Sequence, residues 1–193
     1  MQNHVYDAIV VGAGQAGIAV SCHLKRLGID HLLLDRGHPG ETWRTQRWDS
    51  FVLDTPNSLN RLPCGSMNPG NPNEFPSKYE VVDFFESQVL EQRLPFVQNT
   101  EVSGVRRSAV NGHFEIETFE AVLHASNVVV ASGALNIPKL PTVAAYCPAE
   151  ILSLHSSEYK KAEQLPEGAV LVVGSGKSGS QIAEDLLESN RNV

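Results

Sequence analysis

The sequence predicts an α/β fold in which a parallel sheet carries two strand–turn–helix units. The first observation is a Gly-x-Gly-x-x-Gly turn at residues 12–17, between an apolar run and an amphipathic stretch. The second is the same pattern at residues 174–179, which begins 162 residues further along the chain. The third is an apolar run at 31–34, which closes a β-α-β unit of about thirty residues. Parallel strands joined in this way place a ligand crevice at their carboxyl ends.

A strand, a helix and a second strand open the chain. Residues 5–11 are apolar, rich in β-formers and followed by glycine, which predicts a buried strand. Residues 15–28 predict a helix, because apolar residues recur at helical spacing and Gly28 supplies a C′ residue. Residues 31–35 predict the second strand.

A long loop and a well-marked helix follow. Residues 36–76 contain six prolines and both tryptophans without a sustained period, which favours a functional loop over a disordered one. Residues 77–92 predict a helix, because Ser77 and Glu80 form a capping box ahead of an apolar stripe. This helix carries no chemistry, and we expect it to be part of the core.

The rest of the sequence, from residue 102 onward, predicts antiparallel strands and a second strand–turn–helix unit. Residues 102–119 alternate about an Asn111-Gly112 turn, which is typical of antiparallel strands. Residues 127–133 predict another buried strand that ends in glycine, and 134–148 form a proline-punctuated linker. Residues 169–179 begin a second strand–turn–helix.

Composition and charge limit the class of partner. The chain has 193 residues, of which 41% are hydrophobic and 19% charged, with a formal net charge of -7. This acidity argues against nucleic acid and anionic membrane as main partners. No run approaches the ~20 apolar residues that a membrane helix needs. The start of the chain lacks a basic segment and enters a core strand directly, so we expect no signal peptide and a cytoplasmic protein.

The cysteines predict neither a redox dithiol nor a metal site. Cys22, Cys64 and Cys147 are far apart and form no Cys-x-x-Cys pattern. We therefore expect reduced thiols and no bound metal.

The first glycine turn predicts a dinucleotide site. Gly12 permits the tight turn, Gly14 lets a pyrophosphate approach the backbone, and Gly17 lets the helix pack against the strand. The helix dipole and first-turn N–H groups then face the phosphates. Asp35 ends the second strand 18 residues past Gly17, where a carboxylate accepts the ribose hydroxyls and repels a 2′-phosphate. This half suits FAD or NAD better than NADP, and the alternative is a glycine-rich turn without a ligand.

The second glycine turn resembles a P-loop only superficially. A P-loop that ends at Gly176-Lys177-Ser178 needs glycine at position 171, where this chain has Leu171. Gly-x-Gly-x-x-Gly fits instead, which favours a second dinucleotide. The residue that distinguishes NAD from NADP follows the next strand, which would begin near Val193.

The chain resembles the flavin-containing monooxygenase-like family, which includes bacterial flavoproteins described as linked to cation transport and the plant auxin-forming monooxygenases. The matching segments occur in the family's order and cover nearly the whole chain: "VVGAGQAGIA", "LLLDRG", "GETWR", "VVVASGALNIPKLP", "HSSEYK" and "VLVVGSGKSGSQIAEDL". The resemblance implies a Rossmann-like FAD-binding domain, in which a parallel sheet with helices carries an antiparallel β-meander. The first strand–turn–helix of a second Rossmann-like, NAD(P)-binding domain follows. The implied division is 1–140 for the FAD-binding part, 141–166 for a linker and 167–193 for the start of the second domain.

The resemblance also implies roles for individual residues. The FAD pyrophosphate would lie against Gly12, Ala13, Gly14, Gln15, Ala16 and Gly17. Asp35 would hold the adenosine ribose with Arg36 beside it, Trp43 and Arg44 would line the flavin side, and Gly133 would pass close to FAD. NADPH would meet the second turn, at Gly174, Ser175, Gly176, Lys177, Ser178 and Gly179. For Trp43, the alternative role is that of a loop anchor.

The implied activity is a monooxygenase reaction. In the family, NADPH reduces FAD, and the reduced flavin captures molecular oxygen as a peroxyflavin that transfers one oxygen atom to a small-molecule substrate. The cofactor carries this chemistry, so no catalytic side chain is assigned. Family members run to roughly twice this length, so we expect a truncated chain. The alternatives are a non-catalytic remnant that binds FAD weakly or not at all, and a thioredoxin-reductase-like flavoenzyme.

The chain departs from the family at several positions. The fingerprint Phe-x-Gly-x-x-x-His-x-x-x-Tyr retains His155 and Tyr159 but has Ala149 and Ile151 at its first two positions. In "GETWR" a glutamate stands where a second glycine is common, and Asp54 is the nearest counterpart of an asparagine found near the flavin. We expect the fingerprint histidine to have a structural role at a domain junction.

Overall fold

The protein is built on a six-stranded, mostly parallel sheet. The structure is a computed structural model that describes residues 4–67, 71–110 and 112–193. The strand order is β5-β2-β1-β8-β7-β6. The parallel part contains β1 (Val5–Val11), β2 (His31–Leu34), β5 (Phe96–Val97) and β8 (Val122–Val130). Antiparallel β7 (Phe114–Thr118) and β6 (Val102–Arg107) complete the sheet. The predicted α/β class, with its antiparallel addition, is confirmed; the predicted Asn111 at the turn lies outside the described residues.

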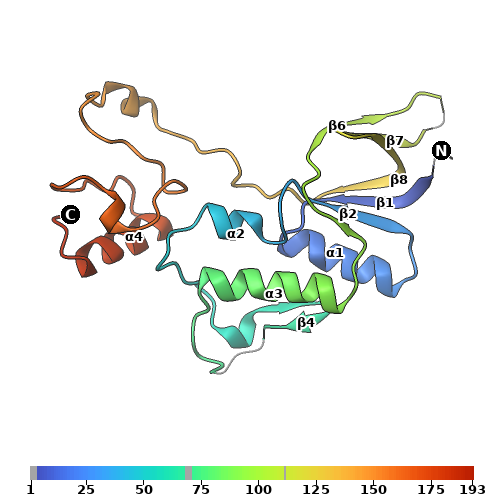
Figure 1. The fold of residues 1–193 in the computed structure, drawn as a ribbon, viewed down its shortest axis with the longest axis horizontal. Helices are drawn as coiled ribbons and strands as arrows, with labels where there is room; N and C mark the ends of the chain where they lie inside the picture. The colour runs from blue at the N-terminus through green and yellow to red at the C-terminus, as the bar shows by residue number, and fades with distance from the viewer. Residues whose placement is uncertain (1–3, 68–70, 111) are drawn as a thin grey trace.

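Alternate residues of β1 build two different cores. Val10 packs with residues of α1 (Gln15–Arg26) and α3 (Lys78–Glu91) on one face of the sheet. Ile9 points the other way and packs with Ile116 of β7 and Ala125 of β8. Successive side chains of a strand alternate between faces, so a continuous apolar run serves both cores. Figure 1 shows the resulting layer of helices beside the sheet.

The helix ends follow the predicted signals. Helix α1 ends at Arg26, and Gly28 follows with a φ of 69°, a left-handed conformation that glycine adopts without strain. At the start of α3 the Ser77 side chain accepts from the Glu80 backbone N–H, and the Glu80 side chain accepts from the Ser77 backbone. The predicted capping box is confirmed.

The segment 36–76 is more structured than predicted. It contains α2 (Glu41–Thr45), the 3₁₀ helix η1 (Asn57–Leu59), and a small hairpin of β3 (Arg61–Leu62) and β4 (Gly65–Ser66). The hairpin contributes Leu62 and Met67 to the core beside α1. Elements this short have too few residues to show a period, which explains why the sequence predicts only a loop.

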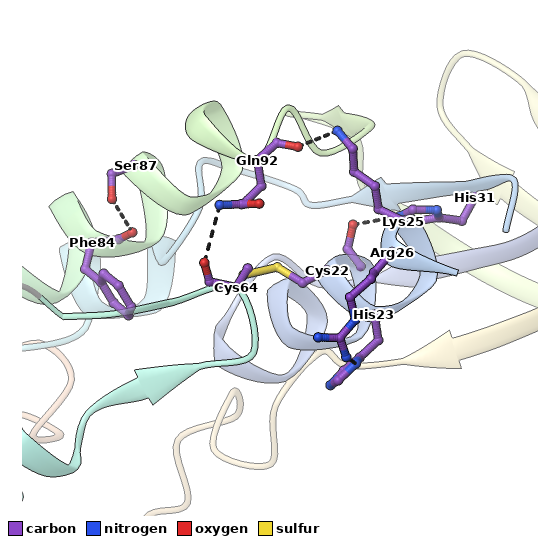
Figure 2. The surroundings of a disulfide bond; sticks show 10 residues. Cys22, His23, Lys25, Arg26, His31, Cys64, Phe84, Ser87 and Gln92 are labelled. Carbon is purple, nitrogen blue, oxygen red and sulfur yellow. Dashed lines mark hydrogen bonds between the residues drawn. A yellow bond between two sulfur atoms is a disulfide. The ribbon is translucent and has the colours of Figure 1, made fainter. Parts of the chain in front are cut away.

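The expectation of three reduced thiols is wrong. Cys22 of α1 and Cys64 of the β3–β4 turn form a disulfide with a Cα–Cα distance of 5.9 Å, whereas Cys147 is free and exposed. Figure 2 shows the bond between the helix and the hairpin, with the Gln92 side-chain amide donating to the Cys64 carbonyl at 3.3 Å. The two cysteines are 42 residues apart in sequence. Only the packing of the hairpin on α1 brings them together.

Two predicted strands differ from expectation. Strand β8 begins at Val122 and is not uniformly buried, because its end borders an open cleft where Val130 is 71% exposed. Residues 170–173 form no strand in the described part of the chain, since the sheet offers them no partner. Leu171 and Val173 are consequently 86% and 76% exposed, as the lack of neighbouring strands predicts.

The C-terminal segment packs against the loop that follows α2. It includes the 3₁₀ helices η2 (Thr142–Tyr146) and η3 (Ala162–Gln164) and ends with α4 (Lys177–Glu188). Ile182 and Leu186 of α4 form a buried cluster with Trp48 and Tyr159. In Figure 1 α4 lies at the opposite end of the molecule from the sheet, and a long connection joins the two. Among the described residues, no helix has the length and apolar content needed to cross a membrane.

Candidate functional site

A cleft of about 1040 Å³ opens at the carboxyl ends of three parallel strands. Val11, Leu34 and Val130, the last residues of β1, β2 and β8, all line it. This is the position at which parallel α/β sheets bind ligands. Among the residues predicted for FAD, those that line the cleft are Gly12, Gly14, Gln15, Ala16, Asp35, Arg36, Trp43 and Gly133.

The glycines of the first turn have three distinct geometries. Gly12 has a φ of 110°, and a Cβ there would lie 2.4 Å from the Ala131 carbonyl oxygen. A Cβ on Gly17 would lie 1.7 Å from the Gly12 carbonyl oxygen, so only glycine permits this close contact of helix and turn. A Cβ on Gly14 would meet nothing within 4 Å. The space beside Gly14 is therefore open to a ligand, whereas the other two glycines are required by the fold itself.

The start of α1 has features that suit an anion. Its N-cap, Gly14, makes no side-chain capping hydrogen bond. The first N–H groups of a helix have no partner within the helix, and the dipole makes this end positive. Gln15 and Ala16 are exposed and line the cleft. A phosphate or pyrophosphate in the cleft can accept hydrogen bonds from this turn.

Asp35 is held in place by the backbone at the same edge. Its Oδ2 accepts from the Ala13 N–H at 2.7 Å, and its Oδ1 accepts from the Gly37 N–H at 2.9 Å. Each carboxylate oxygen has a further lone pair, so the group can still accept from hydroxyls in the cleft. Ala13, whose N–H donates to Asp35, is buried and does not itself line the cleft.

At the end of the cleft that contains Trp43, the lining arginine is not the one that the sequence predicts. Trp43 lines the cleft as predicted, but Arg44 is not among the lining residues and forms an ion pair with Glu86 of α3. Arg47 lines the cleft instead. Sequence reasoning missed Arg47, although its position immediately before Trp48 in a loop already singled out for its tryptophans was an available signal.

The second glycine turn has the same backbone geometry as the first. Gly174 has a φ of 110°, equal to that of Gly12, and a Cβ on Gly179 would lie 2.1 Å from the Gly174 carbonyl oxygen. A Cβ on Gly176 would meet nothing within 4 Å, and this N-cap of α4 makes no side-chain capping bond. The second turn therefore leaves open space beside the first N–H groups of α4, from which a phosphate can accept hydrogen bonds.

A second cavity of about 320 Å³ lies beside this turn. Lys177 and Ser178 of the turn line it, and Trp43 and Arg47 line both this cavity and the first cleft. The Lys177 Nζ lies 2.8 Å from the Asp54 Oδ1. The cleft at the first glycine turn and the cavity beside Lys177 and Ser178 thus adjoin and share an aromatic and a cationic side chain.

Tyr159 contacts α4 and the cluster around Trp48, whereas His155 makes local contacts. The Tyr159 hydroxyl donates to the Asp185 carboxylate of α4, and burial together with this bond raises the pKa of Tyr159 above its usual value. His155 contacts the Ser157 hydroxyl at 2.9 Å, and its backbone N–H donates to the Glu158 carboxylate at 2.8 Å. Tyr159 therefore joins distant segments, whereas the His155 contacts are confined to residues within three positions of it.

Comparison with known proteins places these features in a family. The model of the pyridine nucleotide-disulphide oxidoreductases matches residues 9–193. The chain belongs to this family. It is 39% identical to the uncharacterized oxidoreductase CzcO of Bacillus subtilis (strain 168) over 183 residues, which cover 94% of this chain and 52% of that protein.

Monooxygenases are among the similar proteins. The chain is 29% identical over 191 residues to the probable indole-3-pyruvate monooxygenase YUCCA1 of Arabidopsis thaliana, covering 96% of this chain and 45% of that one. It superposes on a flavin-containing monooxygenase from Stenotrophomonas maltophilia with a TM-score of 0.83 and 25% identity, covering 95% of this chain and 55% of that one. The resemblance to flavin-containing monooxygenases is confirmed. The chain spans about half the length of the curated relatives it matches.

Proposed function

We propose that this chain binds FAD in the first cleft and a nicotinamide nucleotide, NADPH, at the second glycine turn. Together these sites would serve an FAD-dependent monooxygenase reaction on a small organic substrate. The observation that carries the proposal is the pair of glycine turns with matching backbone geometry. Glycines of the first turn line the cleft, Lys177 and Ser178 of the second turn line the second cavity, and Trp43 and Arg47 line both. Family membership supports a flavin- and nicotinamide-dependent oxidoreductase.

The first cleft fits FAD in its donors and its open space. The N–H groups at the start of α1 would bind the pyrophosphate, and the absence of a side chain on Gly14 leaves room for its close approach. Asp35, fixed by two backbone N–H groups, would accept the adenosine ribose hydroxyls. The flavin ring would then extend toward Trp43, at the end of the cleft that adjoins the second cavity.

The second turn would bind the nicotinamide nucleotide. Gly176 would admit its pyrophosphate to the N-terminus of α4, and Lys177 and Ser178 would border the nucleotide in the second cavity. A bound nicotinamide would supply a hydride. A bound flavin would accept it and supply the oxygen chemistry, in which one atom of molecular oxygen enters the substrate and the other leaves as water. The protein's part is to orient the two cofactors and to exclude water from the junction.

The proposed boundaries follow the same division. Residues 1–140 would form the FAD-binding part, 141–166 the linker and 167–193 the beginning of the nucleotide-binding part. The buried cluster around Trp48 would keep the two parts in contact.

A spectrum tests the proposal directly. The purified chain is expected to be yellow, with flavin absorption that is bleached when NADPH is added under nitrogen. The Gly14→Ala variant is the matched control, because the added methyl group meets no protein atom within 4 Å and would obstruct only the ligand. A colourless protein that takes up no added FAD would show a non-catalytic remnant and refute the proposal.

A further inference from the structure

Arg47 occupies the boundary between the two cavities and is held there by aromatic rings. It lines the first cleft and the second cavity. Its guanidinium carbon lies 5.2 Å from the ring centroid of Trp43 and 5.6 Å from that of Phe51. Cation–π attraction of this kind orients the group without neutralising its charge.

No carboxylate neutralises Arg47 within the described part of the chain. Its Nη1 donates to the adjacent Gln46 carbonyl at 3.1 Å, and none of the ion pairs among these residues includes it. In the second cavity, the acidic Asp54 is already paired with Lys177. Arg47 therefore contributes an uncompensated positive charge to the lining of that cavity.

The surroundings of Arg47 add further positive charge. Buried Lys78 donates to the Arg47 carbonyl at 3.2 Å and to the Asp49 carboxylate at 2.7 Å. Burial lowers the pKa of Lys160, and the nearby Lys78 and Arg47 lower it further against the opposing effect of Asp49. Burial also lowers the pKa of Arg47, although a guanidinium remains charged at neutral pH. Lys78 and Lys160 thus add positive charge near Arg47, and the nearby Asp49 carboxylate is already bonded to Lys78.

A half-buried cation without a partner is costly unless a ligand neutralises it. We propose that Arg47 stabilises the negative charge of the reduced flavin ring and so raises the reduction potential of bound FAD. The proposal rests on the proposed function. A hydride from NADPH carries two electrons and one proton, so its transfer leaves NADP⁺ and a reduced flavin with one negative charge. This charge develops where the two cofactors meet, and Arg47 lines both of their proposed cavities.

The reduction potential of bound FAD tests this role independently of turnover. Arg47→Gln is expected to lower the potential by at least about 30 mV, which corresponds to an about tenfold change in the two-electron equilibrium. Arg47→Lys is expected to retain most of the potential because it keeps the charge. Arg44→Gln is the matched control, because Arg44 is three residues away and pairs with Glu86 outside the cleft. Its potential is expected to equal that of the wild type.

The possible outcomes separate the inference from its competitors. Equal potentials in Arg47→Gln and Arg44→Gln would overturn it. An unchanged potential, together with lost binding of benzoate but not of benzamide, would also overturn it and assign Arg47 to a substrate carboxylate. Where glutamine prevents flavin retention, Arg47→Met keeps an apolar stem over the rings and serves the same comparison. A wild-type chain that holds no flavin refutes the proposed function itself, and the inference with it.

Discussion

Replacing Cys22 with serine removes the covalent link between α1 and the β3–β4 hairpin. The hairpin residues Arg61, Leu62 and Pro63 line the first cleft, and the disulfide joins their turn to α1 (Figure 2). Without the bond, the unfolded chain regains the freedom of a loop with a sequence separation of 42 residues. The native contacts of Leu62 and Met67 with the core remain.

The magnitude follows from the entropy of loop closure. For a loop of this length, the chain-entropy relation gives a loss of roughly 13 cal/mol/K in the unfolded state, or about 4 kcal/mol at 25 °C. With a slope of about 2 kcal/mol/M, the midpoint of urea unfolding should fall by about 2 M. Cys147→Ser should leave the free energy of unfolding within about 0.5 kcal/mol of wild type, because that cysteine is free and exposed.

Urea unfolding and thiol titration together test this reasoning. Wild type with reductant should unfold like Cys22→Ser, and denatured, unreduced wild type should contain a single titratable thiol. Three titratable thiols would show that the disulfide is absent in solution. A single thiol with a stability change under about 1 kcal/mol would show that the loop-closure argument fails for this chain.

Three further predictions concern the glycine turn, acid stability and solubility. Gly17→Ala should destabilise the fold by about 2 kcal/mol or more, because its Cβ has no space. Gly14→Ala should preserve stability and weaken FAD binding, because its Cβ meets no protein atom within 4 Å. Equal urea midpoints for the two variants would contradict this prediction. The pKa of Asp49 is lowered, chiefly by its hydrogen bond with Lys78, so its contribution to stability is present above about pH 4 and is lost as the pH falls through the lowered pKa. Urea midpoints between pH 6 and 2.5 should therefore fall less steeply in Asp49→Asn, and identical slopes would refute the pairing. Leu171→Lys should reduce light scattering at high protein concentration with little change in stability, because Leu171 is 86% exposed; a marked loss of stability would show that this side chain is buried in solution.

Local rules account for much of the fold and for part of the site. The apolar run of β1, the capping box of Ser77 and the glycine after α1 each depend on neighbours within a few residues, so the sequence alone predicts them. The same holds for the two glycine turns, because the backbone conformations of Gly12 and Gly174 are properties of short segments. The prediction of a strand at 170–173 is wrong, because a strand requires a hydrogen-bonded partner that its own residues cannot supply.

The sequence by itself determined the α/β class, the two glycine turns and the position of Asp35 at the end of β2. Only the tertiary structure decided which arginine faces the cavities, because the short α2 turns Arg44 toward Glu86 and leaves Arg47 between the aromatic rings. It also decided the pairing of Cys22 with Cys64, which depends on the hairpin packing against α1. Arg44 and Glu86, like Cys22 and Cys64, are 42 residues apart, and local periodicity and spacing carry no information about contacts between such distant segments.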